Sequence, residues 1–221
     1  MNKTVVITGA NRGIGLAMAT IFKQQGNDVY ALCRQSSAAL DALAVHVVTG
    51  ADVATDQGLV NMVAALEAVT VDLLVCNAGI LRDENLTDFN CATIREQFEV
   101  NALAPLRIVQ ALQEQLIQGS KVAMITSRMG SISDNSSGGR YGYRMSKAAL
   151  NAAAMSLSQD LASRNIAVGI FHPGYVQTDM VNHGGDVSAD VAAGRLVNLM
   201  NQLTMQDSGI FRHANGEVLP W

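Results

Sequence analysis

Two side chains that could do acid–base chemistry stand four residues apart past the middle of the chain. Tyr143 and Lys147 belong to the run Tyr-Gly-Tyr-Arg-Met-Ser-Lys, which predicts the start of a helix. Residues i and i+4 share a helix face, so we expect the ammonium close to the phenol. A cation about 4 Å away, at an effective dielectric of about 20, contributes on the order of 4 kcal/mol, or roughly three pKa units. The pair therefore predicts a phenol with a lowered pKa, suited to general acid or base catalysis.

Three glycines follow the first apolar segment of the chain. Residues 4–8 predict a strand, Gly9, Gly13 and Gly15 predict a tight turn, and the apolar periodicity that follows predicts a helix. Glycine lets the backbone approach a ligand, and a helix N-terminus presents free N–H groups to an anion. The spacing Gly-x-x-x-Gly-x-Gly differs from the usual dinucleotide fingerprint and from the P-loop. Its place directly after the first strand nevertheless favours a dinucleotide site.

Strand-like and helix-length segments alternate along the chain, which predicts βαβ units and a parallel sheet. We expect an α/β fold with one doubly wound parallel sheet of about seven strands and helices on both faces. Residues 1–221 should form a single domain, because neither a repeat nor a linker is visible. Strands are predicted at 4–8, 28–33, 45–48, 71–76, 121–126, 166–171 and 209–212. Helices are predicted at 13–25, 37–43, 56–68, 92–118, 141–163 and 188–203.

Composition excludes several classes of partner. Apolar residues make up 49% of the chain and charged residues 15%, which suits a sheet buried on both faces. With a net charge of −4 and no basic cluster, we expect neither nucleic acid nor a membrane as partner. Neither a signal peptide nor a membrane-spanning apolar run is visible. Cys33, Cys76 and Cys91 show no metal spacing and the four histidines are scattered, so we expect a cytoplasmic protein without a metal site.

The chemistry-bearing residues share one position relative to the predicted strands. In open α/β sheets, ligands bind at the carboxyl ends of the strands. Candidates follow six successive strands, in the order Gly9, Arg34, Asp52, Asn77, Ser127 and Pro173. All of them should therefore converge on one edge of the sheet.

Taken together, these features resemble the classical short-chain dehydrogenase/reductase family. The local sequence around Tyr143 and Pro173 is most similar to that of the family's carbonyl-reductase and C-factor-like branch. The resemblance implies a Rossmann-type fold and an NAD(P)-dependent oxidoreductase. It rests on motifs that keep the family's order over most of the chain, namely Thr8-Gly-x-x-x-Gly-x-Gly15, Asn77-Ala-Gly79, Asn101, Ser127, Tyr143-x-x-x-Lys147 and Pro173-Gly174.

The resemblance also implies catalytic roles. Tyr143 would donate a proton to a carbonyl oxygen as hydride reaches the carbon. Lys147 would lower the pKa of Tyr143 and bond the nicotinamide ribose. Ser127 would hold the carbonyl oxygen as negative charge develops on it. Asn101 would help to position a water in a proton relay; its side chain could instead satisfy only a buried backbone group.

A larger set of residues is expected at the cofactor. Asp52 would accept a hydrogen bond from the adenine amino group, and Val176 and Thr178 would bond the nicotinamide carboxamide. The complete set implied by the resemblance is Gly9, Asn11, Arg12, Gly13, Ile14, Gly15, Arg34, Asp52, Val53, Asn77, Ala78, Gly79, Tyr143, Lys147, Pro173, Gly174, Val176 and Thr178.

The end of the second strand bears on the choice of cofactor. An acid there would accept from the ribose of NAD, whereas an arginine suits the 2′-phosphate of NADP. By the resemblance, Cys33 occupies the place of that acid, Arg34 follows it, and Arg12 supplies a second cation. A hydrogen bond to a charged group contributes about 1.5–3 kcal/mol. We therefore expect NADP(H) to be favoured over NAD(H).

Two of the catalytic assignments have rivals nearby. The gap between Ser127 and Tyr143 is a few residues longer than is common in the family, so Ser131 competes for the serine role. Ser127 is preferred because it ends a predicted strand. Tyr141 competes with Tyr143, but the residue four positions after it is Met145, which carries no charge.

The leading expectation is an NADPH-dependent reductase of aldehydes or ketones with a small-molecule substrate. An alcohol dehydrogenase would use the same residues in the oxidative direction. A cofactor-binding signalling protein of C-factor type, without essential turnover, is the third reading. Family habit suggests a homodimer or homotetramer built on the helix at 141–163 and the helix before it. Gly184 and Gly185 could form the hinge of a substrate lid.

Overall fold

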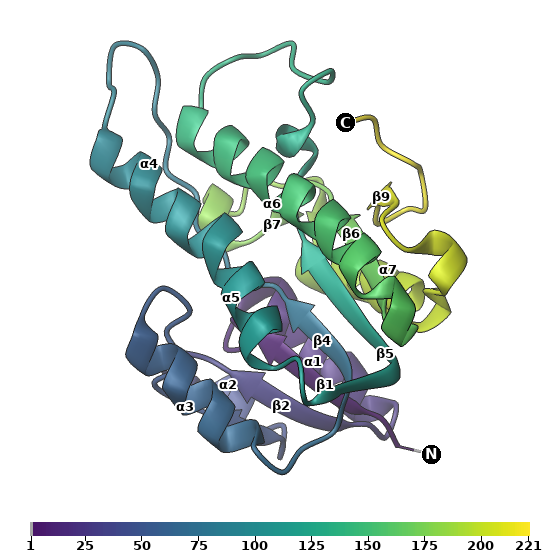
Figure 1. Ribbon diagram of the computed structural model, residues 1–221. Coiled ribbons are helices and arrows are strands. Elements are labelled where there is room, and N and C mark those ends of the chain that lie inside the picture. The colour runs from purple at the N-terminus through teal and green to yellow at the C-terminus, as the bar shows by residue number, and fades with distance from the viewer. Residues whose placement is uncertain (1) are drawn as a thin grey trace.

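Seven parallel strands form one sheet in the computed structural model, which describes residues 2–221 (Figure 1). Their order is β3-β2-β1-β4-β5-β6-β9. The first six follow the order of doubly wound dinucleotide-binding sheets, which confirms the predicted α/β Rossmann-type fold. The strands are β1 (Thr4–Thr8), β2 (Asp28–Leu32), β3 (His46–Val48), β4 (Val71–Cys76), β5 (Leu116–Ile125), β6 (Ala167–His172) and β9 (Phe211–His213).

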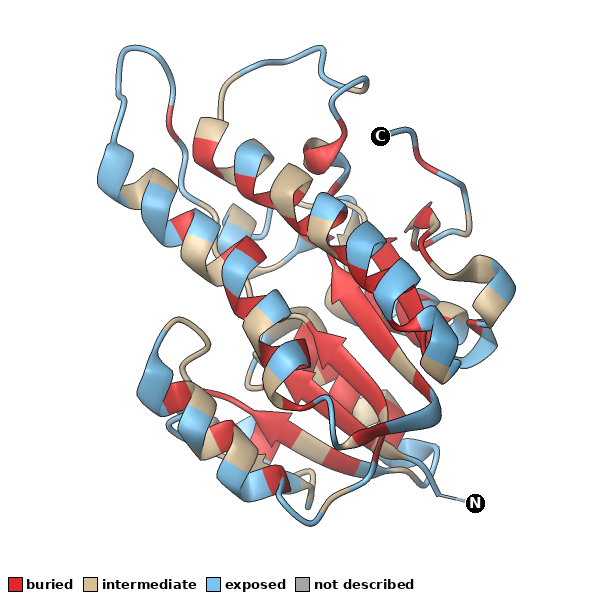
Figure 2. Cartoon of the chain, in the orientation of Figure 1, coloured by how far each residue is buried: buried red, intermediate tan, exposed pale blue. Residues whose placement is uncertain are grey.

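Helices cover both faces of the sheet, and each face has its own apolar core. Val5 and Ile7 of β1 join one core while Val6 joins the other, because side chains alternate along a strand. Figure 2 shows the resulting buried sheet between exposed helix faces. One layer contains α1 (Gly13–Gln24), α2 (Ala38–Asp41) and α7 (Ala189–Gln202), and the other contains α3 (Asp56–Leu66), α5 (Ala104–Ala111) and α6 (Tyr141–Asp160).

The single helix predicted at 92–118 is wrong. The segment divides into α4 (Cys91–Phe98), the π-helical turn η1 (Glu99–Leu103) and α5. In η1 the Ala104 N–H bonds the carbonyl of Glu99, five residues back. The next residue, Pro105, lies in the first turn of α5 and has no N–H, so it cannot bond the Asn101 carbonyl four residues back. The helix then ends at Ala111, because the chain from Leu116 onward pairs with β4 as the early part of β5.

Smaller differences lie in the connections. β5 begins five residues before its predicted start, and its register against β4 is irregular near Val71. The two-stranded sheet of β7 (Val176–Gln177) and β8 (Val187–Ser188) was not predicted. Short 3-10 turns follow several elements, namely η2 (Arg128–Gly130), η3 (Ala162–Arg164), η4 (Asp179–Val181) and η5 (Met205–Asp207). Among the described residues, no helix combines the length and the hydropathy that crossing a membrane requires.

Candidate active site

The turn between β1 and α1 fits a pyrophosphate group. Gly9 has a φ of +67°, and a Cβ on the buried Gly15 would stand 2.2 Å from the Gly9 carbonyl oxygen. No acidic side chain lies in the first turn of α1, and Arg12, at the N-cap, provides no side-chain capping bond. The first N–H groups of α1 are therefore available to an anion.

Two side chains at the carboxyl ends of β1 and β4 hold this turn in place, namely Thr8, the last residue of β1, and Asn77, which follows β4. The Thr8 hydroxyl accepts hydrogen bonds from the backbone N–H groups of Asn77 and Ala78, both at 3.0 Å. The Asn77 amide donates to the carbonyls of Thr8 at 2.9 Å and of Gly9 at 3.2 Å. Asn77 thus shapes the glycine turn through its side chain. The role of Thr8 was not predicted, although its position just before Gly9 was the available signal.

The carboxyl ends of β2 and β3 carry the residues expected at the adenosine half of the cofactor. Cys33 is buried, and burial raises the pKa of its thiol, so this position carries no negative charge at neutral pH. Arg34 is exposed next to it. Asp52 uses one carboxylate oxygen to accept from the backbone N–H of Ala54 at 3.1 Å.

Arg12 reaches across from the glycine turn to the segment after β7. Its guanidinium lies 3.4 Å from a carboxylate oxygen of Asp179, and the other oxygen lies 3.1 Å from a ring nitrogen of His183. The methyl group of Thr178 also faces the turn, 3.4 Å from the position that a Cβ on Gly13 would take. The structure therefore places the residues expected at the carboxamide opposite those expected at the phosphates.

Ser127 and the first turns of α6 meet at the end of β5. The buried Ser127 side chain lies near enough to the Tyr143 phenol to lower the pKa of that phenol, and its hydroxyl accepts from the backbone N–H of Met129 at 3.2 Å. The Lys147 ammonium lies 5.9 Å from the centre of the Tyr143 ring and donates to the Ile125 carbonyl at 3.0 Å. The rival hydroxyl of Ser131 accepts instead from the backbone N–H of Asp134, within its own loop.

The expected lowering of the Tyr143 pKa by Lys147 is wrong for this structure. Burial raises the pKa of Tyr143 above its ordinary value, while the nearby Ser127 side chain and the charge of Arg140 oppose that rise. Burial also lowers the pKa of Lys147 to about 8, so its ammonium is only partly charged in mildly alkaline solution. The phenol is accordingly protonated at neutral pH, the state that a proton donor needs.

Asn101 is buried within the π-helical turn, and its side chain is fully engaged. Its Oδ1 accepts from the backbone N–H of Ile80 and its Nδ2 donates to the carbonyl of Ile80, both at 2.8 Å. Nδ2 also donates to the Ser146 hydroxyl at 3.1 Å. Pro105, four residues further on, has no N–H with which to bond the backbone carbonyl of Asn101 as an α-helix would. The proline four residues after Asn101 was a signal that the sequence interpretation missed.

Two histidines that look unrelated in the sequence pair beside this site. The rings of His172 and His213 lie 5.0 Å apart in an edge-to-face arrangement. Burial lowers the pKa of His172 to about 3, with further lowering by His213, Arg128 and Lys147, so His172 is neutral near pH 7. It directly precedes Pro173, at the end of β6.

Most residues expected at the site are thus brought to one edge of the sheet, while two of them pack against the apolar cores. Gly9, Asn77 and Ser127 follow the neighbouring parallel strands β1, β4 and β5. Ile14 and Val53, which were expected at the cofactor, pack against the two apolar cores.

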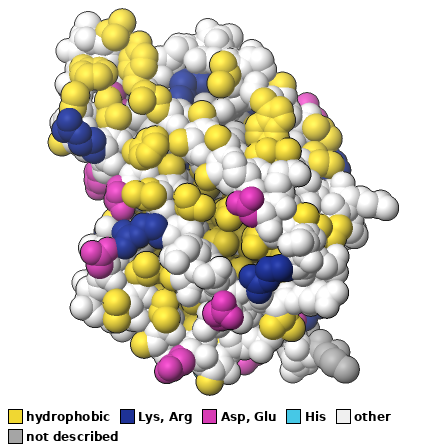
Figure 3. Space-filling view, in the orientation of Figure 1, with side chains coloured by type: hydrophobic (Ala, Val, Ile, Leu, Met, Phe, Trp, Pro, Cys, Tyr) yellow, Lys and Arg dark blue, Asp and Glu magenta, His cyan; other side chains and the backbone are white. Residues whose placement is uncertain are grey.

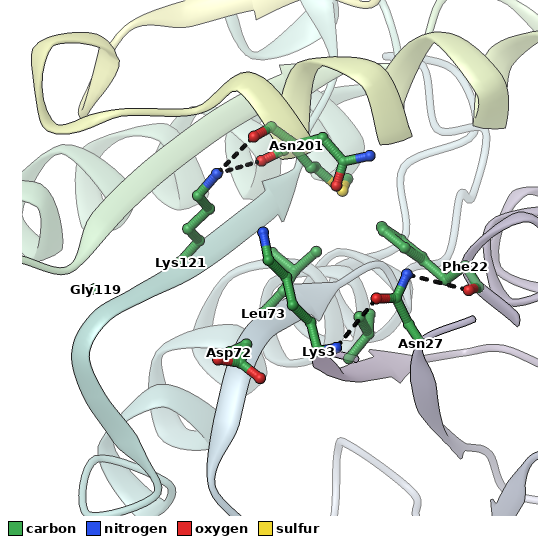
Figure 4. Close-up of a pocket in the computed structure, with 10 residues that line it drawn as sticks. Lys3, Phe22, Asn27, Asp72, Leu73, Gly119, Lys121 and Asn201 are labelled. Atoms are coloured by element: carbon green, nitrogen blue, oxygen red, sulfur yellow. Dashed lines mark hydrogen bonds between the residues drawn. The ribbon is translucent and has the colours of Figure 1, made fainter. Parts of the chain in front are cut away.

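A pocket at the opposite edge carries none of these residues (Figure 4). It is lined near the amino ends of β1 and β4, by Lys3 and Asp72 among others. The Lys121 ammonium points from it to the C-terminal end of α7, where it donates to the carbonyls of Met200 and Asn201 at 3.0 and 2.8 Å. A cation at a helix C-terminus is stabilising there, and this accounts for Lys121 without a ligand.

Comparisons with known proteins agree with this arrangement. A family model described as short chain dehydrogenase matches residues 3–186. The chain is 36% identical over 225 residues to 1-hydroxy-2-glutathionyl-2-methyl-3-butene dehydrogenase of Rhodococcus sp. strain AD45, covering 99% of both proteins. It is 40% identical over 154 residues to C-signal of Myxococcus xanthus, covering 68% of this chain and 93% of that protein.

A solved structure extends the likeness to the whole fold. The NADPH-bound carbonyl reductase from chicken fatty liver superposes with a TM-score of 0.86 at 29% identity, covering 100% of this chain and 99% of that one. The glycine turn, the Ser127, Tyr143 and Lys147 cluster and these relatives lead to one assignment. The chain is an NAD(P)-dependent oxidoreductase that belongs to the short-chain dehydrogenase/reductase family.

Proposed function

We propose that this protein reduces an aldehyde or ketone with NADPH, with Tyr143 as the proton donor. The observation that carries the proposal is a buried, protonated phenol near Ser127, with Lys147 one helical turn further on, at the sheet edge that also bears the glycine turn. Reduction needs a proton for the carbonyl oxygen, and a phenol with a raised pKa keeps its proton at neutral pH.

Each residue of the cluster has a distinct task in this proposal. The nicotinamide supplies hydride when bound. The Ser127 hydroxyl donates to the substrate oxygen and stabilises the negative charge that develops there. Lys147 reaches toward the cofactor ribose and returns a proton to Tyr143. The backbone carbonyl of Asn101, which Pro105 cannot bond, holds a water through which Lys147 recovers its proton.

Preference for NADPH rests on the end of β2. Arg34 is exposed next to the neutral, buried Cys33, so this strand end attracts a 2′-phosphate and offers no carboxylate to a ribose. Arg12 can add a second contact after it leaves Asp179, since that surface ion pair contributes only about 0–1 kcal/mol. The NADPH in the chicken carbonyl reductase supports the same preference.

Two other readings have support of their own. The Rhodococcus relative is a dehydrogenase, which favours catalysis in the oxidative direction with an alcohol substrate. The likeness to C-signal favours a signalling role that requires cofactor binding without essential turnover. The complete Asn101, Ser127, Tyr143 and Lys147 set argues against the second of these, since a binding module needs no proton relay.

The test is oxidation of NADPH and NADH at 340 nm against aldehydes, ketones, quinones and diketones. We expect turnover with NADPH and a loss of about 10²- to 10⁴-fold in Tyr143→Phe, because the variant retains the ring and loses the proton. NADPH binding should be unchanged in the variant. Binding without turnover by the wild type would instead direct the work to alcohols with NADP⁺ and to signalling assays.

We also propose that the protein is a homodimer or homotetramer built on α4, α5 and α6. These helices and the π-helical turn η1 expose apolar side chains, namely Phe98, Leu103, Leu106, Met145 and Met155. Apolar groups are visible over this face of the molecule in Figure 3. Apolar side chains gathered on one exposed face are typical of interaction sites. Sedimentation velocity would give the oligomeric state. A cytoplasmic location stays a prediction.

A further inference from the structure

A ladder of side-chain hydrogen bonds joins the helical segment of Asn101 to the chain that follows β4. The Asn101 side chain bonds both backbone groups of Ile80. Four residues earlier, the side-chain oxygen Oε1 of Gln97 accepts from the backbone N–H of Arg82 at 2.8 Å. The helical residues are spaced by four and their partners by two. Four helical residues advance about 6 Å and two extended residues about 6.6 Å, so the two segments can stay in register.

The ladder ends at a buried carboxylate. Glu84 is 3% exposed, and its Oε1 accepts from the Thr93 hydroxyl and from the Gln97 amide, both at 2.7 Å. Its Oε2 is buried and has no hydrogen-bond partner among the residues that the structure describes. A buried acid side chain is costly unless its charge is stabilised. The groups packed against the Glu84 carboxylate therefore indicate its role.

Glu84 packs against the first turn of α6, which carries Tyr143. The Glu84 backbone carbonyl accepts from the N–H of Arg140 at 2.7 Å, and Arg140 provides no side-chain cap for the helix. A Cβ on Gly142 would stand 3.1 Å from Glu84 Oε1 and 2.4 Å from the Gln97 amide nitrogen. The carboxylate thus lies against the positive end of α6, where a negative charge is favourable.

We propose that Glu84 is a positioning residue for the reduction, acting through α6. Its buried carboxylate ties α4 and the segment after Gly79 to the first turn of α6. This contact holds the Tyr143 phenol where it can meet both Ser127 and a substrate oxygen. The inference rests on the proposed function, because it takes Tyr143 as the proton donor.

The direct test is Glu84→Gln, compared with Glu84→Asp and with the control Glu96→Gln. The first variant keeps the shape, removes the charge and places an amide where an oxygen now faces α6. The second keeps the charge on a shorter side chain. The control removes an exposed carboxylate on α4, the helix that Glu84 contacts, where Glu96 pairs with Arg82 at 3.0 Å.

We expect kcat of Glu84→Gln to fall about 10- to 100-fold, since a misplacement of about 1 Å can reduce catalysis by about 10²-fold. The dissociation constant of NADPH should stay within about twofold, because the glycine turn and Arg34, which we propose hold its phosphates, lie on other elements and Lys147 is retained. Amide exchange at Arg144–Lys147, whose N–H groups bond the carbonyls of Arg140 and the first turn of α6, should accelerate. Glu84→Asp should recover part of the lost kcat, and Glu96→Gln should match the wild type in every measurement.

Three outcomes would overturn the inference. Glu84→Gln with wild-type kcat, beside an inactive Tyr143→Phe, would remove Glu84 from positioning and leave the proposed function intact. A parallel loss of NADPH affinity and kcat would mean that Glu84 only stabilises the fold. If the wild type reduces no carbonyl, the proposed function fails, and unchanged amide exchange at Arg144–Lys147 in Glu84→Gln would then overturn the inference as well.

Discussion

Lys147 should make the protein less stable at neutral pH than a variant without its charge. Burial lowers the pKa of Lys147 from 10.5 to about 8. Between these values the unfolded chain binds more protons than the folded protein, so this residue makes stability rise with pH. This lowering of the Lys147 pKa on folding corresponds to about 3 kcal/mol of destabilisation at pH 7, of which about 1 kcal/mol remains at pH 10.

Lys147→Met isolates this effect. Urea unfolding of both proteins under reducing conditions, at pH 7, 8, 9 and 10, gives the difference in unfolding free energy at each pH. We expect the wild type to gain about 2 kcal/mol relative to the variant from pH 7 to pH 10. The comparison is needed because burial raises the pKa of Cys76 to about 12, which makes stability fall above pH 9 in both proteins. A difference that does not change with pH would refute a depressed pKa for Lys147.

Three further substitutions test the cofactor site and the proton relay. Gly15→Ala should abolish binding of NADPH and NADH in fluorescence titrations, because its Cβ would stand 2.2 Å from the Gly9 carbonyl oxygen; retained binding would contradict the close packing of the turn. Arg34→Ala should weaken NADPH binding about 10- to 150-fold and NADH binding little, as loss of about 1.5–3 kcal/mol implies; equal weakening would count against the NADP preference. Pro105→Ala should lower kcat in the carbonyl assay, because the new N–H competes for the Asn101 carbonyl; an unchanged kcat would remove that carbonyl from the relay.

Much of the framework was predictable because its signals are local. The strand at residues 4–8 was predicted to the residue, and the start of α6 at Tyr141 was also correct. Apolar periodicity and glycine turns are read from neighbouring residues, and parallel βαβ units place every strand's carboxyl end at one edge. The long helix at 92–118 failed because the pairing of Leu116 with β4 is a distant contact that overrides local helical preference.

The sequence by itself determined which residues meet at the sheet edge, since strand order and chain direction suffice to bring Ser127, Tyr143 and Lys147 together. Only the tertiary structure decided how those groups behave. Burial raises the pKa of Tyr143. How far this side chain is shielded from water depends on every segment packed around α6, and the spacing of Tyr143 and Lys147 does not reveal it. The buried partnership of Glu84 and Gln97 likewise has no local signature, because it forms only when the chain after β4 docks on α4.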